Sequence, residues 1–261
     1  MGTELLKARL SFKPRMNILF SAKPDYKKAL HWGFYGSGHK LHFGDFTEES
    51  IKEKDLLVPI GIPDLKYLSG LGLTDNPLPI PDLKAIEICD DKYLFYQTLQ
   101  EKGFGDYLPK ISDDLPYPYI LKKSISDYSI DCFVIHNAET ENEHKDLIGK
   151  PGYFCQQMIE GTTEFATHII YKKGQILASL NIKYAFDNKT PIKGKIKPIY
   201  KKICPCPYLD LFADILKEIG FEGLCCFNYK ELNGRPYILE INPRFGSSLS
   251  LFFLSFARRL N

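Results

Sequence analysis

The sequence has no run of about 18 apolar residues, the minimum that a membrane-spanning helix needs. Its N-terminal stretch also lacks the apolar core and the small-residue cleavage site of a secretory leader, so we expect a cytoplasmic protein with no membrane partner. The charges nearly cancel, with 34 Lys and Arg against 32 Asp and Glu. This balance gives no general case for nucleic acid as a partner.

Cysteine pairs with the spacing of a zinc site are absent. The seven Cys include Cys204 and Cys206, and also the adjacent Cys225 and Cys226, all closer together than ordinary tetrahedral ligands. Cys225 and Cys226 lie within an apolar segment, where a free thiol behaves as a small hydrophobic side chain. Structural thiols are therefore favoured over a metal site.

A full GxGxxG motif is missing from the N-terminal part, but strand and helix patterns alternate there. Residues 17–21 and 56–60 are short apolar runs, whereas residues 26–32 and 48–54 can form helices. Such alternation is typical of a small parallel sheet of Rossmann-like type. The Pro-rich segment 76–81 has the composition of a connector.

The connector predicts a domain boundary, with one unit at residues 1–81 and a second at residues 82–261. The second unit begins with two helical patterns, at residues 82–90 and 91–102. A further helix is expected between Pro207 and Gly220, since an apolar stripe lies between those two residues.

Two apolar, β-rich segments, residues 224–230 and 236–241, flank Asn233-Gly234, which is a strong hairpin signal. Glu240 and Asn242 are two residues apart and so share one face of the second strand. Asn228 can lie opposite them on the first strand.

Oxygen ligands from neighbouring strands suit Mg²⁺, which takes the rest of its coordination shell from water and substrate phosphates. Glu240, Asn242 and Asn228 are therefore the candidate metal ligands. Arg244 follows two residues after Asn242, and its guanidinium group can donate bidentate hydrogen bonds to phosphate or carboxylate oxygens. The plainer alternative is an ordinary hairpin with a polar end.

The sequence Glu240-Ile-Asn242-Pro-Arg244 resembles the last-strand signature of the ATP-grasp superfamily. This resemblance implies a mixed α/β (α+β) fold: a short Rossmann-like N-terminal unit followed by a two-lobe ATP-grasp domain. It also implies an ATP-dependent, ADP-forming ligase that activates a carboxylate as an acylphosphate for attack by an amine or a thiol. ATP and Mg²⁺, with Mn²⁺ as an alternative ion, would then be the cofactors, and small-molecule carboxylates and amines the substrates.

The resemblance extends to residues that would bind the phosphates of ATP. Lys122 ends an apolar strand pattern, where the family has a Lys that reaches the α- and β-phosphates; simple extension of its ammonium into solvent is the alternative. Lys92 belongs to an Asp-Lys pair at a helix start, as in the family, although Asp91 also suits the helix dipole. Ser129 ends the segment where a phosphate-binding loop is expected.

Residues 153–161 resemble the hinge strand between the two lobes. In the family, the backbone at the positions of Gln157 and Ile159 meets the adenine edge, and a Glu at the place of Glu164 binds the ribose hydroxyls. The alternative is a β-edge with an exposed Glu.

Two departures from the family pattern keep a second function open. Asn228 is neutral where the family usually has an acid, and the expected phosphate loop, residues 124–129, contains no Gly. The alternative to a ligase is therefore an ATP-binding module with weak or no turnover.

Residues 189–202 contain six Lys and no acid. Such a run is commonly solvated or disordered, but it could also close over the triphosphate as a flap or bind an acidic partner. Residues 139–150 are expected to form a solvated surface loop, and residues 249–260 a last helix. Gly246, Ser247 and Ser248 before that helix could hold a substrate carboxylate or acylphosphate. A homodimer is an open alternative for the oligomeric state.

Overall fold

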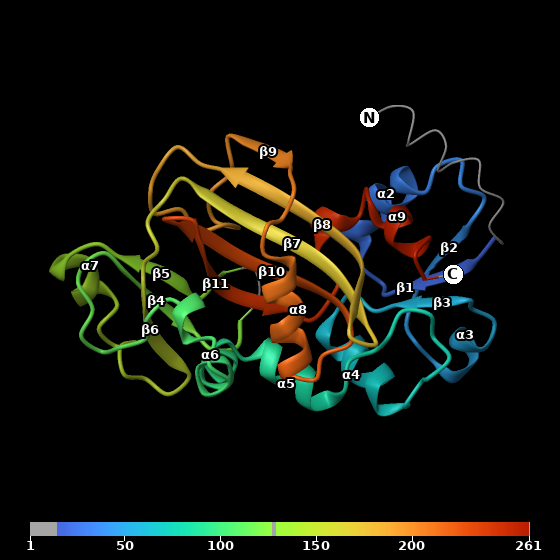
Figure 1. The fold of residues 1–261 in the computed structure, drawn as a ribbon, viewed down its shortest axis with the longest axis horizontal. Coiled ribbons are helices and arrows are strands. Elements are labelled where there is room, and N and C mark those ends of the chain that lie inside the picture. Colours follow the sequence, from blue (N-terminus) through green and yellow to red (C-terminus); the bar gives the residue numbers. More distant parts are fainter. Residues whose placement is uncertain (1–14, 127–128, 261) are drawn as a thin grey trace.

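The computed structural model describes residues 15–126 and 129–260, and it contains three sheets that follow one another along the molecule (Figure 1). The N-terminal stretch that lacks a leader pattern lies outside the described residues. Within these residues, no helix is both long and apolar enough to cross a membrane.

The first sheet is parallel, with the strand order β2-β1-β3, as the alternating pattern predicts. Ile18 and Phe20 of the central strand are fully buried. The elements of this unit are β1 (Asn17–Phe20), α2 (Pro24–Gly33), β2 (Lys40–Phe43), α3 (Glu48–Lys52), β3 (Leu56–Val58) and α4 (Ile62–Gly70).

Two helices lead out of this unit, α5 (Leu83–Asp90) and α6 (Lys92–Glu101), each capped by an Asp. Asp82 accepts a hydrogen bond from the Ala85 N–H, and Asp91 accepts from two N–H groups of the first turn of α6. These caps satisfy backbone donors that a helix start leaves without partners. Both predicted helices are therefore present, and Lys92 lies at the first position of α6.

The second sheet is antiparallel, with the order β5-β4-β6. The expectation of a surface loop over residues 139–150 is wrong for its first part, where a short helix forms. Asn137 accepts from the Thr140 N–H while the Thr140 hydroxyl accepts from the Asn137 N–H, a reciprocal cap that starts the helix. The elements are η1 (Gly105–Tyr107), β4 (Tyr119–Lys123), β5 (Cys132–Ile135), α7 (Ala138–Glu143) and β6 (Tyr153–Gln157).

The third sheet is antiparallel, with the order β11-β10-β7-β8-β9, and it includes the predicted C-terminal hairpin. Part of the lysine-rich run is ordered as β9, which pairs with β8 at the edge of the sheet, and all four residues of β9 are exposed to solvent. The elements are β7 (Thr163–Lys172), β8 (Gln175–Ala185), β9 (Tyr200–Ile203), α8 (Leu209–Glu218), β10 (Gly223–Leu232) and β11 (Arg235–Asn242).

The chain then returns to the first unit, and its last helix is much shorter than predicted. Only a 3₁₀ turn, η2 (Ser247–Leu249), and α9 (Phe253–Ala257) form. The carbonyls of Ser250 and Leu251 lie against Gly33 of α2, at 2.8 Å from the place a Cβ would take. Phe253 also packs on Phe20 with ring centroids 5.8 Å apart. The predicted helix at residues 249–260 is thus interrupted where the chain contacts the first unit. The domain boundary after residue 81 stays a prediction.

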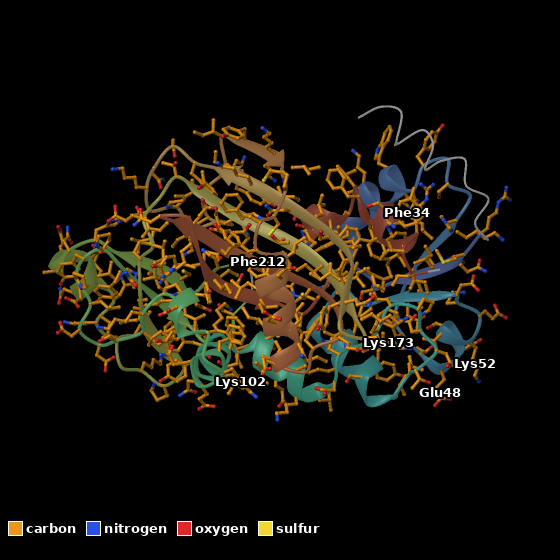
Figure 2. The ribbon with its side chains drawn as sticks, viewed as in Figure 1. Phe34, Glu48, Lys52, Lys102, Lys173 and Phe212 are labelled. Atoms are coloured by element: carbon orange, nitrogen blue, oxygen red, sulfur yellow. The ribbon has the colours of Figure 1, made fainter. Side chains whose placement is uncertain are left out.

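The main core lies between one face of the third sheet and the helices α5, α6 and α8 (Figure 2). The rings of Phe212 and Phe227 stack with centroids 4.1 Å apart, and neither side chain is exposed. Cys225 is buried in the same core and Cys226 on the opposite face of β10, as expected of structural thiols.

We predict that Phe212→Ala lowers the free energy of unfolding by about 3–5 kcal/mol, because it leaves a cavity against Phe227. Urea denaturation followed by circular dichroism measures the change. Tyr35→Ala is the control, since Tyr35 is 76 % exposed and its loss should cost less than about 0.5 kcal/mol. Equal midpoints for the two variants would contradict this assignment of the core.

Candidate active site

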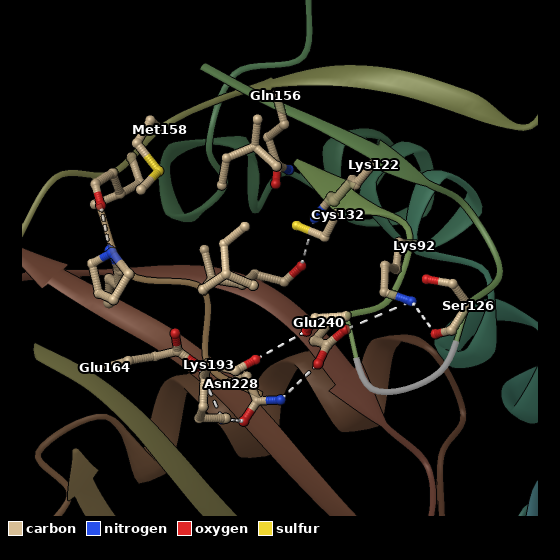
Figure 3. Close-up of a pocket in the computed structure, with 17 residues that line it drawn as sticks. Lys92, Lys122, Ser126, Cys132, Gln156, Met158, Glu164, Lys193, Asn228 and Glu240 are labelled. Carbon is tan, nitrogen blue, oxygen red and sulfur yellow. Dashed lines mark hydrogen bonds and ion pairs between the residues drawn. The ribbon is translucent and has the colours of Figure 1, made fainter. Parts of the chain in front are cut away.

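A cavity lies between the second and third sheets (Figure 3). Its lining comes from β4, β5, β6, β7, β10 and β11, from the start of α6 and from three loops. Seven of the predicted site residues line it: Lys92, Lys122, Ser129, Ile159, Glu164, Asn228 and Glu240. The three others, Gln157, Asn242 and Arg244, do not.

Glu240 stands at the centre of the polar part. Asn228 is its direct neighbour across the β10–β11 ladder and donates from Nδ2 to Glu240 Oε1 at 2.7 Å, while Asn242 donates to the same oxygen at 3.1 Å. Burial alone would raise the pKa of Glu240. The ammonium groups of Lys92 and Lys122 and the bond from Asn228 outweigh it and lower the pKa to about 2. Glu240 is therefore ionised at neutral pH.

Two lysines face Glu240 from the opposite side of the cavity, Lys92 at the start of α6 and Lys122 in β4. Lys92 Nζ lies 3.7 Å from Glu240 Oε2 and donates to the Ser126 carbonyl at 3.0 Å. Lys122 is buried, and its Nζ lies 3.4 Å from the Leu239 carbonyl. Burial lowers the pKa of Lys122 to about 8, although Cys132 and Glu240 act in the opposite direction.

A third lysine in the cavity, Lys193, comes from the lysine-rich run. Its Nζ lies 2.9 Å from Glu164 Oε1 and also donates to Asn228 Oδ1. Burial opposes the charge of Lys193, but Glu164 prevails and raises the pKa to about 12. The sequence did not distinguish this lysine from the five others of the run, because only the tertiary fold turns it inward.

The apolar part of the cavity includes Ile120, Met158, Ile159 and Leu239. A slot of this kind suits a flat, apolar ring. Lys230, which also lines the cavity, donates to the Ile159 carbonyl at 2.8 Å and so holds the hinge segment, residues 153–161, in place. Lys230 was missed, although a Lys that ends an apolar strand segment is the same signal that indicated Lys122.

Gln157, whose backbone was expected to meet the adenine edge, does not line the cavity, whereas its neighbour Gln156 does. Successive side chains of a strand point to opposite faces, and the buried one here is Gln156. The Gln157 backbone N–H donates to the Lys110 carbonyl at 2.7 Å, which occupies the group that was expected to meet the adenine edge.

Arg244 lines a second cavity at the end of β11, together with Lys23, Tyr26 and residues 60–63 of the first unit. Ser248, in the turn that follows, lies with its hydroxyl 2.8 Å from Nε2 of His168. Burial lowers the pKa of His168 to about 3, so this imidazole is neutral. Of the residues predicted to face the acyl group, Arg244 thus lies against the first unit, whereas Ser248 contacts His168 of β7.

The residues present fit a magnesium ion. Glu240 is an ionised carboxylate in the cavity, and the neighbouring Asn242 carries an amide whose nitrogen donates to Glu240 Oε1; carboxylate and amide oxygens are hard donors. Among the described residues, no group of three or more His, Cys, Asp or Glu side chains could hold a metal by itself. Any ion at Glu240 would therefore depend on phosphate oxygens to complete its coordination shell.

Comparison with solved structures shows the same fold in several ligases. Phosphoribosylamine–glycine ligase from Thermotoga maritima superposes with a TM-score of 0.69 at 15 % identity, over 92 % of this chain and 71 % of that one. L-amino acid ligase from Bacillus licheniformis gives 0.62 at 16 % identity, over 91 % and 69 %. D-alanine–D-alanine ligase from Bacillus anthracis, in complex with ATP, gives 0.56 at 14 % identity, over 88 % and 87 %. Among curated proteins, no sequence matches significantly.

The sequence profile of the ATP-grasp domain matches residues 89–248, which is more than half of the chain. The matched segment contains β4, β5, β6, β7, β10 and β11, the strands that line the cavity, and it includes Lys92, Lys122 and Glu240. On this match and on the shared fold, the chain belongs to the ATP-grasp domain family.

Proposed function

We propose that this protein is an ATP-dependent ligase that forms an acylphosphate and passes its acyl group to an amine, with ADP as a product. The observation that carries the proposal is the cavity itself, in which an apolar slot runs into a cluster of lysines around the ionised Glu240. Such a cavity suits a nucleotide, because its two ends match a purine ring and a triphosphate.

The predicted nucleotide-binding residues then have the following roles. Lys122 and Lys92 bind phosphate oxygens, and Ser129 adds a hydroxyl at the loop. Glu164 has one oxygen paired with Lys193, and its other oxygen is assigned to the ribose hydroxyls. Ile159 and its apolar neighbours hold the adenine, whereas Gln157 keeps the hinge strand in place.

Glu240 and Asn242 would hold Mg²⁺, or Mn²⁺ in its place. This ion, when bound, supplies positive charge to the phosphates during transfer. In the reaction, an oxygen of the substrate carboxylate attacks the γ-phosphorus and the bond to the β–γ bridging oxygen breaks, which releases ADP. The amine nitrogen then attacks the acyl carbon, phosphate leaves, and the nitrogen loses a proton.

The second cavity is the proposed substrate site. Arg244 and Lys23 give it two cationic groups, which suit the oxygens of a carboxylate and of the acylphosphate. The similar structures named for amino-acid and D-alanine ligases support amino acids as the first substrates to test. We place the reaction in the cytoplasm, with small molecules as partners and a homodimer as an open alternative.

A nucleotide-binding module with little or no turnover is the second candidate. The neutral Asn228, bonded to Lys193, favours it, since this position offers no charge to a metal ion. Such a module would be stabilised by ATP without making product, which the following measurement separates from a ligase.

We predict that the wild-type protein releases ADP with Mg²⁺ and a matching pair from a panel of amino acids and small carboxylates. Glu240→Gln should reduce this release at least about 100-fold, because the carboxylate is lost while the shape is kept. Glu231→Gln on the same hairpin is the control, since Glu231 is exposed and lies outside the cavity. ATP-dependent thermal stabilisation without any ADP release would favour the silent module instead.

We also predict that nucleotide affinity falls as the pH rises through about 8, the pKa of Lys122. Lys122 binds phosphate as an ammonium, so its deprotonation removes the attraction, and the Kd should rise about tenfold between pH 7 and pH 9. Calorimetric titration with a non-hydrolysable ATP analogue measures the Kd. In Lys122→Arg, which stays charged, the Kd should change little over this range. The same pH slope in both proteins would remove Lys122 from the phosphate site.

A further inference from the structure

The position of Lys193 bears on how many metal ions the site can take. Its ammonium group lies between Glu164 and Asn228, on the side of Asn228 that faces away from Glu240 (Figure 3). The Lys193 carbonyl accepts from the Ser129 hydroxyl at 3.0 Å, and its Nζ lies 5.2 Å from the centroid of the Tyr184 ring. Both ends of the residue are therefore anchored.

These contacts fix which way the Asn228 amide points. Its oxygen accepts from the Lys193 ammonium, and its NH₂ group donates to Glu240. A flipped amide would bring its NH₂ against an ammonium and its oxygen against a carboxylate, and both contacts would be repulsive. The oxygen that could have been a metal ligand is thus already bound to a cation.

The remaining donors at this end of the cavity are few. Glu240 is the carboxylate that lines this end, and Asn242, whose amide nitrogen donates to Glu240 Oε1 at 3.1 Å, carries a neutral amide. Paired metal ions in phosphoryl-transfer sites lie only about 3.5–4 Å apart, so their mutual repulsion has to be offset by surrounding negative charge. One carboxylate supports a single divalent ion better than two.

We propose that Lys193 takes the place of a second metal ion, so that the site holds one Mg²⁺ at Glu240 and Asn242. This inference rests on the proposed function, since it concerns the binding of ATP. When the nucleotide enters, the ammonium keeps its bonds to Glu164 and Asn228 and donates its third N–H to a phosphate oxygen. It contributes one positive charge beside the phosphates, without needing a carboxylate from position 228.

The test counts metal ions rather than turnover. Mn²⁺ is titrated into the wild-type protein saturated with a non-hydrolysable ATP analogue, and the bound ions are counted by electron paramagnetic resonance. We expect one Mn²⁺ per chain in the wild type. Asn228→Asp/Lys193→Met, which restores an acid and removes the ammonium, should bind two, with the spin coupling of a close pair.

Single variants make the result specific. Lys193→Met should still bind one Mn²⁺ but should bind the analogue about 10- to 100-fold more weakly, the usual effect of losing a charged hydrogen bond. Lys197→Met, an exposed lysine of the same run, should behave as the wild type. Two Mn²⁺ ions in the wild type would overturn the inference and leave the proposed function intact. Failure of the wild type to bind the analogue at all would overturn both.

Discussion

The charge of Glu240 is the constraint around which the rest of the site is arranged. A carboxylate that is partly removed from water is costly unless cations and hydrogen-bond donors surround it. Here Asn228 and Asn242 donate to one oxygen, and Lys92 approaches the other at 3.7 Å. Because Lys92 and Lys122 belong to the other side of the cavity, the second sheet has to face the third for this charge to be accommodated.

The same strand carries the core and the site on its two faces. Phe227 of β10 stacks on Phe212 of α8, while the next residue, Asn228, points into the cavity. This follows from the alternation of side chains along a strand. The packing on the core face of β10 therefore positions the polar groups on its cavity face. Glu240 of β11 is positioned in turn by its pairing with Asn228 of β10.

The cavity has an excess of positive charge, since four lysines and two glutamates line it: Lys92, Lys122, Lys193, Lys230, Glu164 and Glu240. Two of the lysines are occupied by structural contacts, Lys230 with the hinge carbonyl and Lys193 with Glu164. Lys92 and Lys122 face Glu240 from across the cavity. A bound triphosphate together with one divalent metal ion would offset this excess positive charge, as expected for a nucleotide site of an ATP-grasp protein.

Local patterns were enough to predict much of the molecule. The alternating strands and helices of the first unit, the two Asp-capped helices and the C-terminal hairpin were all predicted, because each depends on contacts between residues close in sequence. The hairpin turn by itself would set Asn228 opposite Leu239, and a β-bulge between Asn228 and Tyr229 shifts the register so that Asn228 pairs with Glu240. The ATP-grasp resemblance, drawn from Glu240 to Arg244, is confirmed by the family match.

The tertiary structure alone decided what depends on distant contacts. It turned Lys193 of a uniformly basic run into the cavity, and it set Gln156 rather than Gln157 in the lining. It also shortened the last helix, where Phe253 packs on Phe20 from the opposite end of the sequence. In each case the deciding energy comes from burial and pairing between segments far apart in the chain, which no local pattern records.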